Sequence, residues 1–183
     1  MKKPTKSFEI ALSALACTAA ALCLTVGSYG DFLLGAGYIL AVFSLMIPLS
    51  KEFWAGSLLA AVGASLLAFL FYGFSIFTIA PFLMFFGLHP SINFLQKKYI
   101  KKAWLHVVCF FVKAVWFDLV MWFSWRYLLV ELFGLSEASW YPFVERYFFA
   151  VLFVGGTLVF ACYDYAIFLC QRTMNALVKR IRR

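Results

Sequence analysis

Long runs of apolar residues, each about as long as a membrane-spanning helix, follow one another along almost the whole chain. A helix needs roughly 20 apolar residues to cross a bilayer core about 30 Å thick. No polar stretch of comparable length separates the runs, and only 13% of the 183 residues are charged, about half the share in an average soluble domain. The sequence therefore predicts an all-α integral membrane protein, with residues 1–183 forming a single transmembrane domain.

The breaks between the apolar runs predict six transmembrane helices in a compact bundle. Turn-forming or charged residues interrupt the runs, because Gly, Pro, Ser and Asp favour turns over helix interiors. These breaks lie at residues 27–31, 48–52, 71–75, 95–102 and 134–142. The expected helices cover residues 8–28, 32–48, 53–71, 75–95, 103–131 and 146–171. Within the fourth helix, Pro81, Gly87 and Pro90 predict a kink that frees some backbone carbonyl groups.

The basic residues indicate the orientation of this bundle, because short cytoplasmic loops collect Lys and Arg. With a cytoplasmic N-terminus, every basic residue except Lys113, Arg126 and Arg146 falls on the cytoplasmic side of the six-helix topology. We therefore expect both termini in the cytoplasm, and a multi-pass protein of the bacterial inner (cytoplasmic) membrane. The short basic clusters lie between apolar spans, which suits anionic headgroups of the lipid bilayer and argues against a nucleic-acid partner.

Small residues recur at four-residue steps in the first and third predicted helices. Ala16 and Ala20 lie one turn apart in the first helix, and Gly56, Ala60 and Ala64 form a ridge along the third. Such ridges let two helix backbones approach closely in lipid, where apolar side chains alone give no preference for a protein neighbour. Packing within the chain and docking of another membrane protein would both use these ridges.

In these features the chain resembles the substrate-binding S components of energy-coupling-factor transporters. The similarity lies in six short helices, in the Ala16-x-x-x-Ala20 step of an alanine-rich first helix, and in a Gly/Ala-rich third helix after the turn "PLSKEFWAG" at 48–56. The resemblance implies a protein that binds a small solute, such as a vitamin-like micronutrient, near the outer face. It also implies docking, through Ala16 and Ala20, on a transmembrane coupling protein with ATPase subunits. The alternative is a non-transporting membrane scaffold or assembly subunit of the same helical plan.

Two ionisable residues, Lys113 and Asp164, are expected to form a buried ion pair. At about 1.5 Å per residue, Lys113 lies roughly 15 Å from the cytoplasmic end of the fifth helix, and Asp164 lies about 10 Å from the same side on the sixth. An isolated charge at such depth costs about 2.5–3.5 kcal/mol on insertion scales, so each residue should face the interior of the bundle and meet the other. A structural or conformational role and a role toward a substrate are both compatible with this pair.

A second group of polar residues, nearer the outer face, is the candidate binding site. Asp118, Trp122 and Arg126 follow one another at four-residue steps and form one stripe on the fifth helix. The predicted outer loops add Tyr29, Asp31 and Tyr72. Together these groups suit a small polar or aromatic solute, which they would hold by hydrogen bonds and stacking. Alternatively, Trp122 belongs to an aromatic belt at the membrane surface and Arg126 extends to the lipid headgroups.

The sequence offers little support for catalysis. It lacks the signatures G-x-S-x-G and H-E-x-x-H and a phosphate-binding Gly-rich loop. An intramembrane aspartyl protease needs two aspartates at one depth, but Asp118 lies roughly 12 Å nearer the outer face than Asp164 by helical rise. His89 and His106 have no acidic residues close to them in the sequence, and the five cysteines show no metal-binding spacing. We therefore expect no enzymatic activity, no cofactor and no metal ion.

Overall fold

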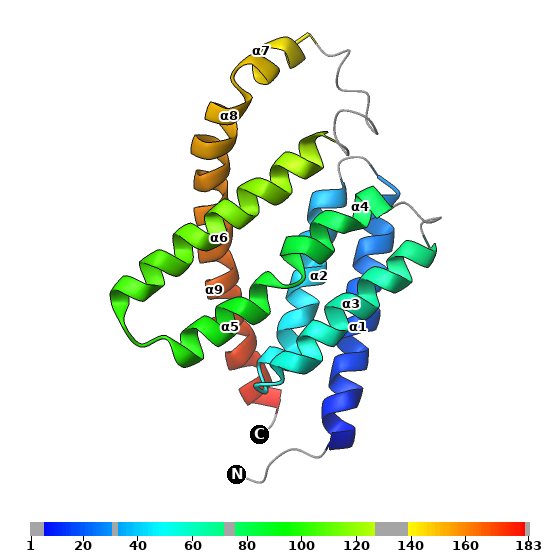
Figure 1. The fold of residues 1–183 in the computed structure, drawn as a ribbon. Coiled ribbons are helices and arrows are strands. Elements are labelled where there is room, and N and C mark those ends of the chain that lie inside the picture. The colour runs from blue at the N-terminus through cyan, green and yellow to red at the C-terminus, as the bar shows by residue number, and fades with distance from the viewer. Residues whose placement is uncertain (1–5, 31–32, 72–75, 127–138, 182–183) are drawn as a thin grey trace. The chain divides into compact units, whose positions relative to one another are not determined.

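The computed structural model describes residues 6–30, 33–71, 76–126 and 139–181, and these residues are almost entirely helical (Figure 1). Within these ranges, five helices are long and apolar enough to cross a membrane. They are Lys6–Ser28, Trp54–Phe71, Thr78–Tyr99, Ala103–Ser124 and Phe148–Ala176. The helix Leu33–Leu49 is also apolar but has only 17 residues. The prediction of an all-α multi-pass membrane protein is confirmed, whereas the sixth crossing and the cytoplasmic position of the termini stay predictions.

The chain divides into two compact units. Unit 1 comprises Met1–Tyr99 together with Ile167–Arg183, and unit 2 comprises Ile100–Ala166. The last helix, α9 (Thr157–Ile181), contributes its first part to unit 2 and its second part to unit 1. The single transmembrane domain expected from the sequence stays a prediction.

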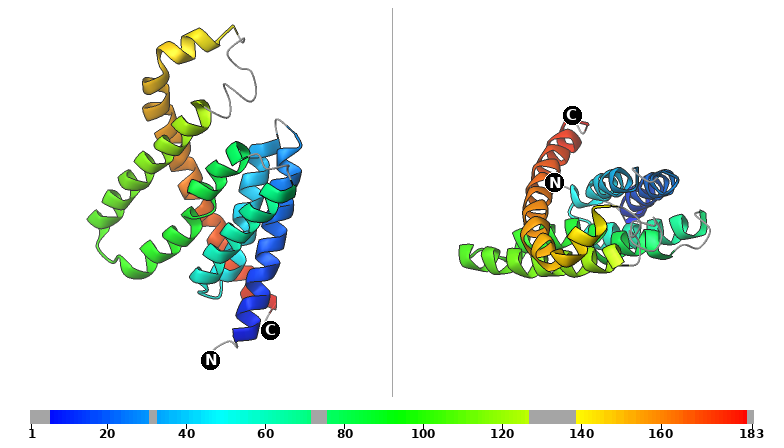
Figure 2. Two further views of the ribbon diagram at one scale, coloured as in Figure 1. Left: turned by 45° about the vertical axis from the view of Figure 1, so that its right-hand side comes forward. Right: turned by 90° about the horizontal axis from the view of Figure 1, so that it is seen from above.

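Unit 1 contains three helices that lie side by side (Figures 1 and 2). They are α1 (Lys6–Ser28), α2 (Leu33–Leu49) and α3 (Trp54–Phe71). Glycines bring their backbones together: a Cβ atom on Gly37 of α2 would lie 2.9 Å from the Cα atom of Gly27 in α1. On α3, a Cβ atom at Gly56 would collide with the Ser13 hydroxyl of α1. The close approach of these helices therefore depends on the absence of side chains at both places.

The small-residue ridges are used within unit 1. Ala16 and Ala20 of α1, and Ala60 and Ala64 of α3, are all buried, with at most 2% of each residue exposed. Packing within the chain, one of the two uses that the sequence left open, accounts for these four residues. In this conformation their side chains are not accessible to a partner protein.

The fourth predicted helix is interrupted in the structure. It consists of α4 (Ile76–Pro81), a π-helical segment η1 (Phe82–Phe86) and α5 (His89–Tyr99). The N–H of Gly87 donates a hydrogen bond to the carbonyl of Phe82 at 2.7 Å, a five-residue step that is typical of a π-helix. Pro90 lies in the first turn of α5, where a missing N–H is tolerated. The predicted kink therefore takes the form of one widened turn.

Helix α5 continues to Tyr99, four residues beyond the predicted end at residue 95. Contacts made by two lysines of the predicted loop explain this difference. Lys98 pairs with Glu52 at 2.8 Å, and the Lys97 ammonium lies 4.7 Å from the centre of the Phe168 ring. Cations are also favourable in the last turn of a helix, because that end carries partial negative charge. The helix thus keeps its charged residues, and only residues 100–102 connect it to the next helix.

Unit 2 is built around α6 (Ala103–Ser124). The segments α7 (Tyr141–Arg146), α8 (Phe148–Ala150) and the π-helical η4 (Val151–Gly156) precede α9, and η4 contacts α6 (Figure 1). Phe160 of α9 is fully buried, and its ring centre lies 5.3 Å from that of Phe110 and 5.6 Å from that of Phe117 on α6. The predicted end of the fifth helix, residues 127–131, lies outside the described residues.

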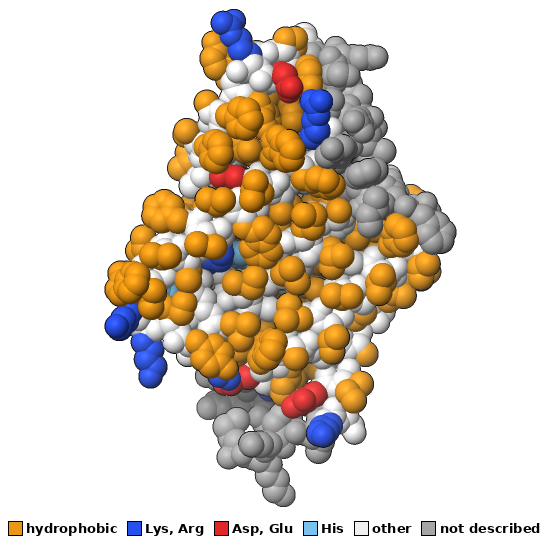
Figure 3. Space-filling model, in the orientation of Figure 1, with side chains coloured by type: hydrophobic (Ala, Val, Ile, Leu, Met, Phe, Trp, Pro, Cys, Tyr) orange, Lys and Arg blue, Asp and Glu red, His pale blue; other side chains and the backbone are white. Residues whose placement is uncertain are grey.

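Large apolar side chains also cover the outer surfaces of the helices (Figure 3). Leu59 and Leu66 on α3, and Phe111 and Leu119 on α6, are each more than half exposed. Soluble monomers rarely expose contiguous apolar surface on this scale. Contact with lipid explains these faces, and it agrees with the length and composition of the helices.

Candidate functional site

The structure brings together Lys113 of α6 and Asp164 of α9. The Lys113 ammonium nitrogen lies 2.9 Å from Oδ1 of Asp164, a distance typical of a charge-assisted hydrogen bond. The two side chains are 7% and 23% exposed, and the ammonium also lies 6.0 Å from the centre of the Phe160 ring. The pair therefore ties α6 to α9 in a largely buried position, where each charge offsets the other.

Asp118, one and a half turns further along α6, has a different environment. Only 3% of this residue is exposed. Its Oδ2 atom lies 3.5 Å from the hydroxyl of Thr157, which makes a long hydrogen bond, and within the described part of the chain its Oδ1 atom has no hydrogen-bond partner. A buried polar atom without a partner in a native structure calls for an explanation, such as a function or an absent ligand.

Gly156 makes this position of Asp118 possible. A Cβ atom at Gly156 would lie 2.6 Å from Oδ1 of Asp118, so the carboxylate packs directly against the backbone of η4. Gly156 is the last residue of η4, and π-helical turns are frequent at functional sites. By contrast, no described atom lies within 4 Å of a Cβ built on the neighbouring Gly155. The carboxylate can therefore occupy this position only because residue 156 is a glycine.

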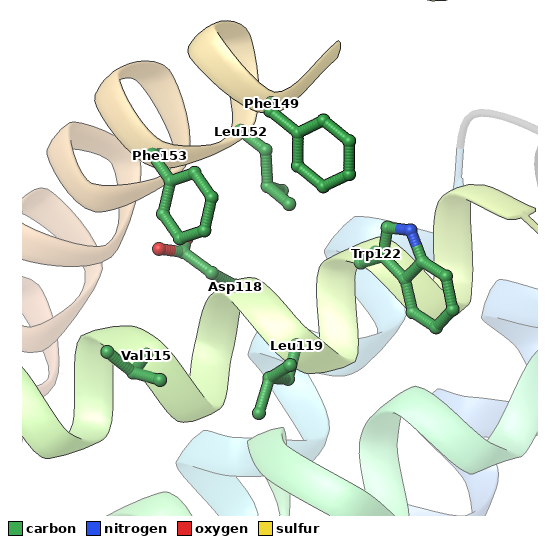
Figure 4. A pocket seen from close by; sticks show the side chains of 7 residues that line it. All are labelled: Val115, Asp118, Leu119, Trp122, Phe149, Leu152 and Phe153. Carbon is green, nitrogen blue, oxygen red and sulfur yellow. The ribbon is translucent and has the colours of Figure 1, made fainter.

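Asp118 also lines a cavity of about 330 Å³ between α6 and the segments α8 and η4 (Figure 4). The lining residues are Val115, Asp118, Leu119 and Trp122 from α6, Phe149 from α8, and Leu152 and Phe153 from η4. Leu119, Phe149 and Phe153 are each more than half exposed, so the cavity is an open groove. We call it the Asp118 groove. Its volume lies at the lower end of the range for small-molecule sites, about 300–1,000 Å³.

Figure 4 shows how the two sides of the groove are arranged. Val115 and Trp122 mark its two ends along α6, and the rings of Phe149 and Phe153 face α6 from the other side. The Asp118 side chain points from α6 toward Phe153. Among the residues that line the groove, Asp118 alone is ionisable. The groove thus combines apolar and aromatic walls with a single carboxylate.

Arg126, the third residue of the predicted stripe, is not among the residues that line the groove. Its guanidinium lies 3.8 Å from the Glu145 carboxylate of α7, and both side chains are about half exposed. Beside this pair, the Trp125 ring stacks on Tyr141 with an angle of 2° between the planes. Desolvation, followed by the negative charge of Glu145, raises the pKa of Tyr141 above its ordinary value. Arg126 therefore belongs to an aromatic surface cluster.

Of the remaining predicted site residues, the structure describes only Tyr29, which follows α1, is strongly exposed and is not among the residues that line the groove. Asp31 and Tyr72 lie outside the described residues. The residues that sequence reasoning missed are Phe149, Phe153 and Gly156. The "VGGT" sequence at 154–157 was the available signal, because two adjacent glycines in an apolar helix indicate a close approach or a backbone irregularity.

No cluster of three or more His, Cys, Asp or Glu side chains that could hold a metal ion occurs among the described residues. All five cysteines are free thiols. His89, buried in unit 1, stacks on Phe85 with 5.0 Å between the ring centres, which is a packing arrangement. No family model, curated protein or solved structure matches the chain.

Proposed function

We propose that this chain is the solute-binding subunit of an uptake system in the bacterial cell membrane. In this proposal a small solute enters the Asp118 groove, and the chain then docks on a separate coupling complex that hydrolyses ATP. The observation that carries the proposal is the buried Asp118 carboxylate, whose Oδ1 atom lacks a hydrogen-bond partner within the described residues, beside an apolar groove of about 330 Å³. Ionisable groups inside membrane segments commonly mark ligand or ion sites, because burying a charge in the membrane without a function costs free energy.

The predicted orientation supports access to the groove from outside the cell. Asp118 lies roughly 22 Å along α6 from Ala103, at about 1.5 Å per residue. With Ala103 at the cytoplasmic side of a core about 30 Å thick, Asp118 lies in the outer half of the bilayer. Reporter fusions to the C-terminus check this orientation: fluorescent protein should fold there, whereas alkaline phosphatase, which needs the periplasm, should be inactive.

The resemblance to S components supports the coupling step. Because Ala16 and Ala20 are buried, docking on a coupling protein would use the exposed apolar faces of α1 and α3. Those faces present Leu15, Leu22, Leu59, Leu66 and Leu70. The contact would then resemble other associations of membrane helices, which rely on van der Waals packing.

A membrane scaffold is the second candidate, and the packing of unit 1 favours it. The interlocked glycines of α1 and α2, with the buried alanines of α1 and α3, make a tightly packed core whose outer faces are free to bind neighbours.

Affinity purification of the chain from its own membranes separates the two functions. Recovery of a transmembrane coupling protein together with paired ATPases, in amounts that increase with ATP depletion or with solute, supports uptake. Recovery of cell-wall or division proteins, with no ATPase in the complex, favours the scaffold and contradicts the uptake function. A variant with Leu59 and Leu66 both replaced by Trp serves as a control, because it should weaken docking without changing the Asp118 groove.

A further inference from the structure

We propose that the solute of the Asp118 groove is a lipophilic cation, in which a protonated amine or quaternary ammonium group is joined to an aromatic or alkyl body. This inference rests on the proposed function, because it names the class of solute that the same groove accepts.

The charge of the groove selects a cation. Asp118 is the single ionisable residue among those lining the groove, and α8 and η4 on the opposite side carry none. The nearest basic residues before and after Asp118 in the sequence each have an acidic partner: Lys113 of α6 pairs with Asp164, and Arg126, just beyond α6, pairs with Glu145. An anionic solute would therefore meet a carboxylate in an apolar site, whereas a cation would gain an ion pair strengthened by the low dielectric.

The walls of the groove select an apolar body. Trp122, Phe149 and Phe153 present aromatic rings, and rings of this kind attract ammonium groups through their negative faces. Val115, Leu119 and Leu152 complete an apolar lining. Hydrated metal ions fit poorly, because Ca²⁺ and Mg²⁺ require several oxygen ligands and the lining supplies one carboxylate. The combination suits an organic cation that partitions into lipid before it binds.

The Asp118 carboxylate packs against Gly156, where a Cβ atom would lie 2.6 Å from Oδ1. Among the described residues, the 3.5 Å contact with Thr157 is its single side-chain hydrogen bond. Rotation of the side chain turns Oδ1 away from the glycine and into the groove, where it meets the cation. This rotation replaces a weak contact with an ion pair, so a bound cation should favour the conformation in which the carboxylate faces the groove.

The test compares two ions of similar size and opposite charge. The protein is purified in a neutral maltoside detergent, and binding of radiolabelled tetraphenylphosphonium and of radiolabelled tetraphenylborate is measured in separate experiments, because the two ions pair with each other in one solution. We expect saturable binding of the phosphonium ion, no saturable binding of the borate ion, and at least a tenfold loss of affinity for the phosphonium ion in Asp118→Asn. Glu52→Gln removes an exposed carboxylate of unit 1 that does not line the groove, and it should leave the affinity unchanged. Circular dichroism and gel filtration verify that each variant is folded.

The possible failures are distinguishable. If both ions bind equally well, and Trp122→Ala weakens this binding whereas Asp118→Asn does not, the groove binds solutes but the proposed cationic class is wrong. If neither ion binds saturably, and a neutral aromatic compound of the same size also fails, both this inference and the proposed function fall. If Asp118→Asn does not fold, the comparison of the two ions on the wild-type protein still shows which charge the groove prefers. If added phosphatidylethanolamine competes with tetraphenylphosphonium, the ligand of the groove is a lipid ammonium group, and the proposal of a free solute is wrong.

Discussion

Replacing Lys113 or Asp164 alone should destabilise unit 2 far more than replacing both together. The ion pair is short, 2.9 Å, and the Lys113 side chain is only 7% exposed. Removing one partner of a buried pair costs about 3–5 kcal/mol, because the other charge stays buried without compensation. Asp164 retains some exposure, so we expect Lys113→Met to lower the free energy of unfolding by about 2–3 kcal/mol and Asp164→Asn by about 3 kcal/mol.

The double variant should lose less than about 1 kcal/mol, because neither charge is then left alone. The coupling energy of the cycle is therefore expected to be about 4 kcal/mol or more in magnitude. The measurement is unfolding by dodecyl sulfate in mixed micelles, followed by circular dichroism, for the wild type, the two single variants and the double variant.

A second ion pair provides a matched control for the effect of burial. Lys98 and Glu52 lie 2.8 Å apart, almost the same distance, but their side chains are 42% and 69% exposed. The corresponding cycle, with Lys98→Met and Glu52→Gln, should show a much smaller coupling energy, because water and salt screen exposed pairs. Equal coupling energies in the two cycles would refute the view that burial makes the Lys113 pair strong.

Three further predictions follow from single positions. Gly156→Ala should lower the free energy of unfolding by about 1–3 kcal/mol, because the added Cβ would overpack against Asp118. Gly155→Ala should be close to neutral, because the space around its Cβ is open. We expect the unfolding midpoint of Gly156→Ala to be the lower of the two, and equal midpoints would contradict the prediction. Gly37→Ala should likewise destabilise unit 1 by about 1–3 kcal/mol, because its Cβ would lie 2.8 Å from a backbone oxygen of α1, and Gly35→Ala is the neutral control in the same unfolding assay. Binding of tetraphenylphosphonium should weaken as the pH falls, because protons compete with the cation for the Asp118 carboxylate; an affinity that is constant with pH in the wild type, as expected only for Asp118→Asn, would contradict this competition.

The helices and the buried ion pair follow from local rules that the sequence displays. Breaks that contain Gly or Pro mark the ends of α1, α2 and α3, and helical rise alone places Lys113 and Asp164 at similar depth. The widened turn at Phe82–Phe86 follows from the proline and glycine on either side of it. In each case the relevant distance runs along one helix, where it is fixed by backbone geometry.

The groove and its neighbours depend on contacts that a single helix does not determine. The stripe of Asp118, Trp122 and Arg126 is correct as helical geometry, but Glu145 from α7 pairs with Arg126 and separates its role from that of Asp118. The aromatic side of the groove comes from Phe149 of α8 and Phe153 of η4, which lie more than 20 residues after Asp118 in the sequence. Whether a ridge of alanines packs within the chain or on a partner is equally invisible in the sequence, because both uses need the same residues.

The π-helical turn of η4 also affects how the groove responds to a change in the length of the chain. A π turn holds one residue more than an ordinary α-helical turn, so a residue deleted between Val151 and Gly156 should convert the wide turn into an α-helical one and leave the segments on either side in place. A residue deleted from the regular helix α6, in contrast, would rotate everything after it by about 100°. A single deletion should consequently disturb the groove less on the η4 side than on the α6 side.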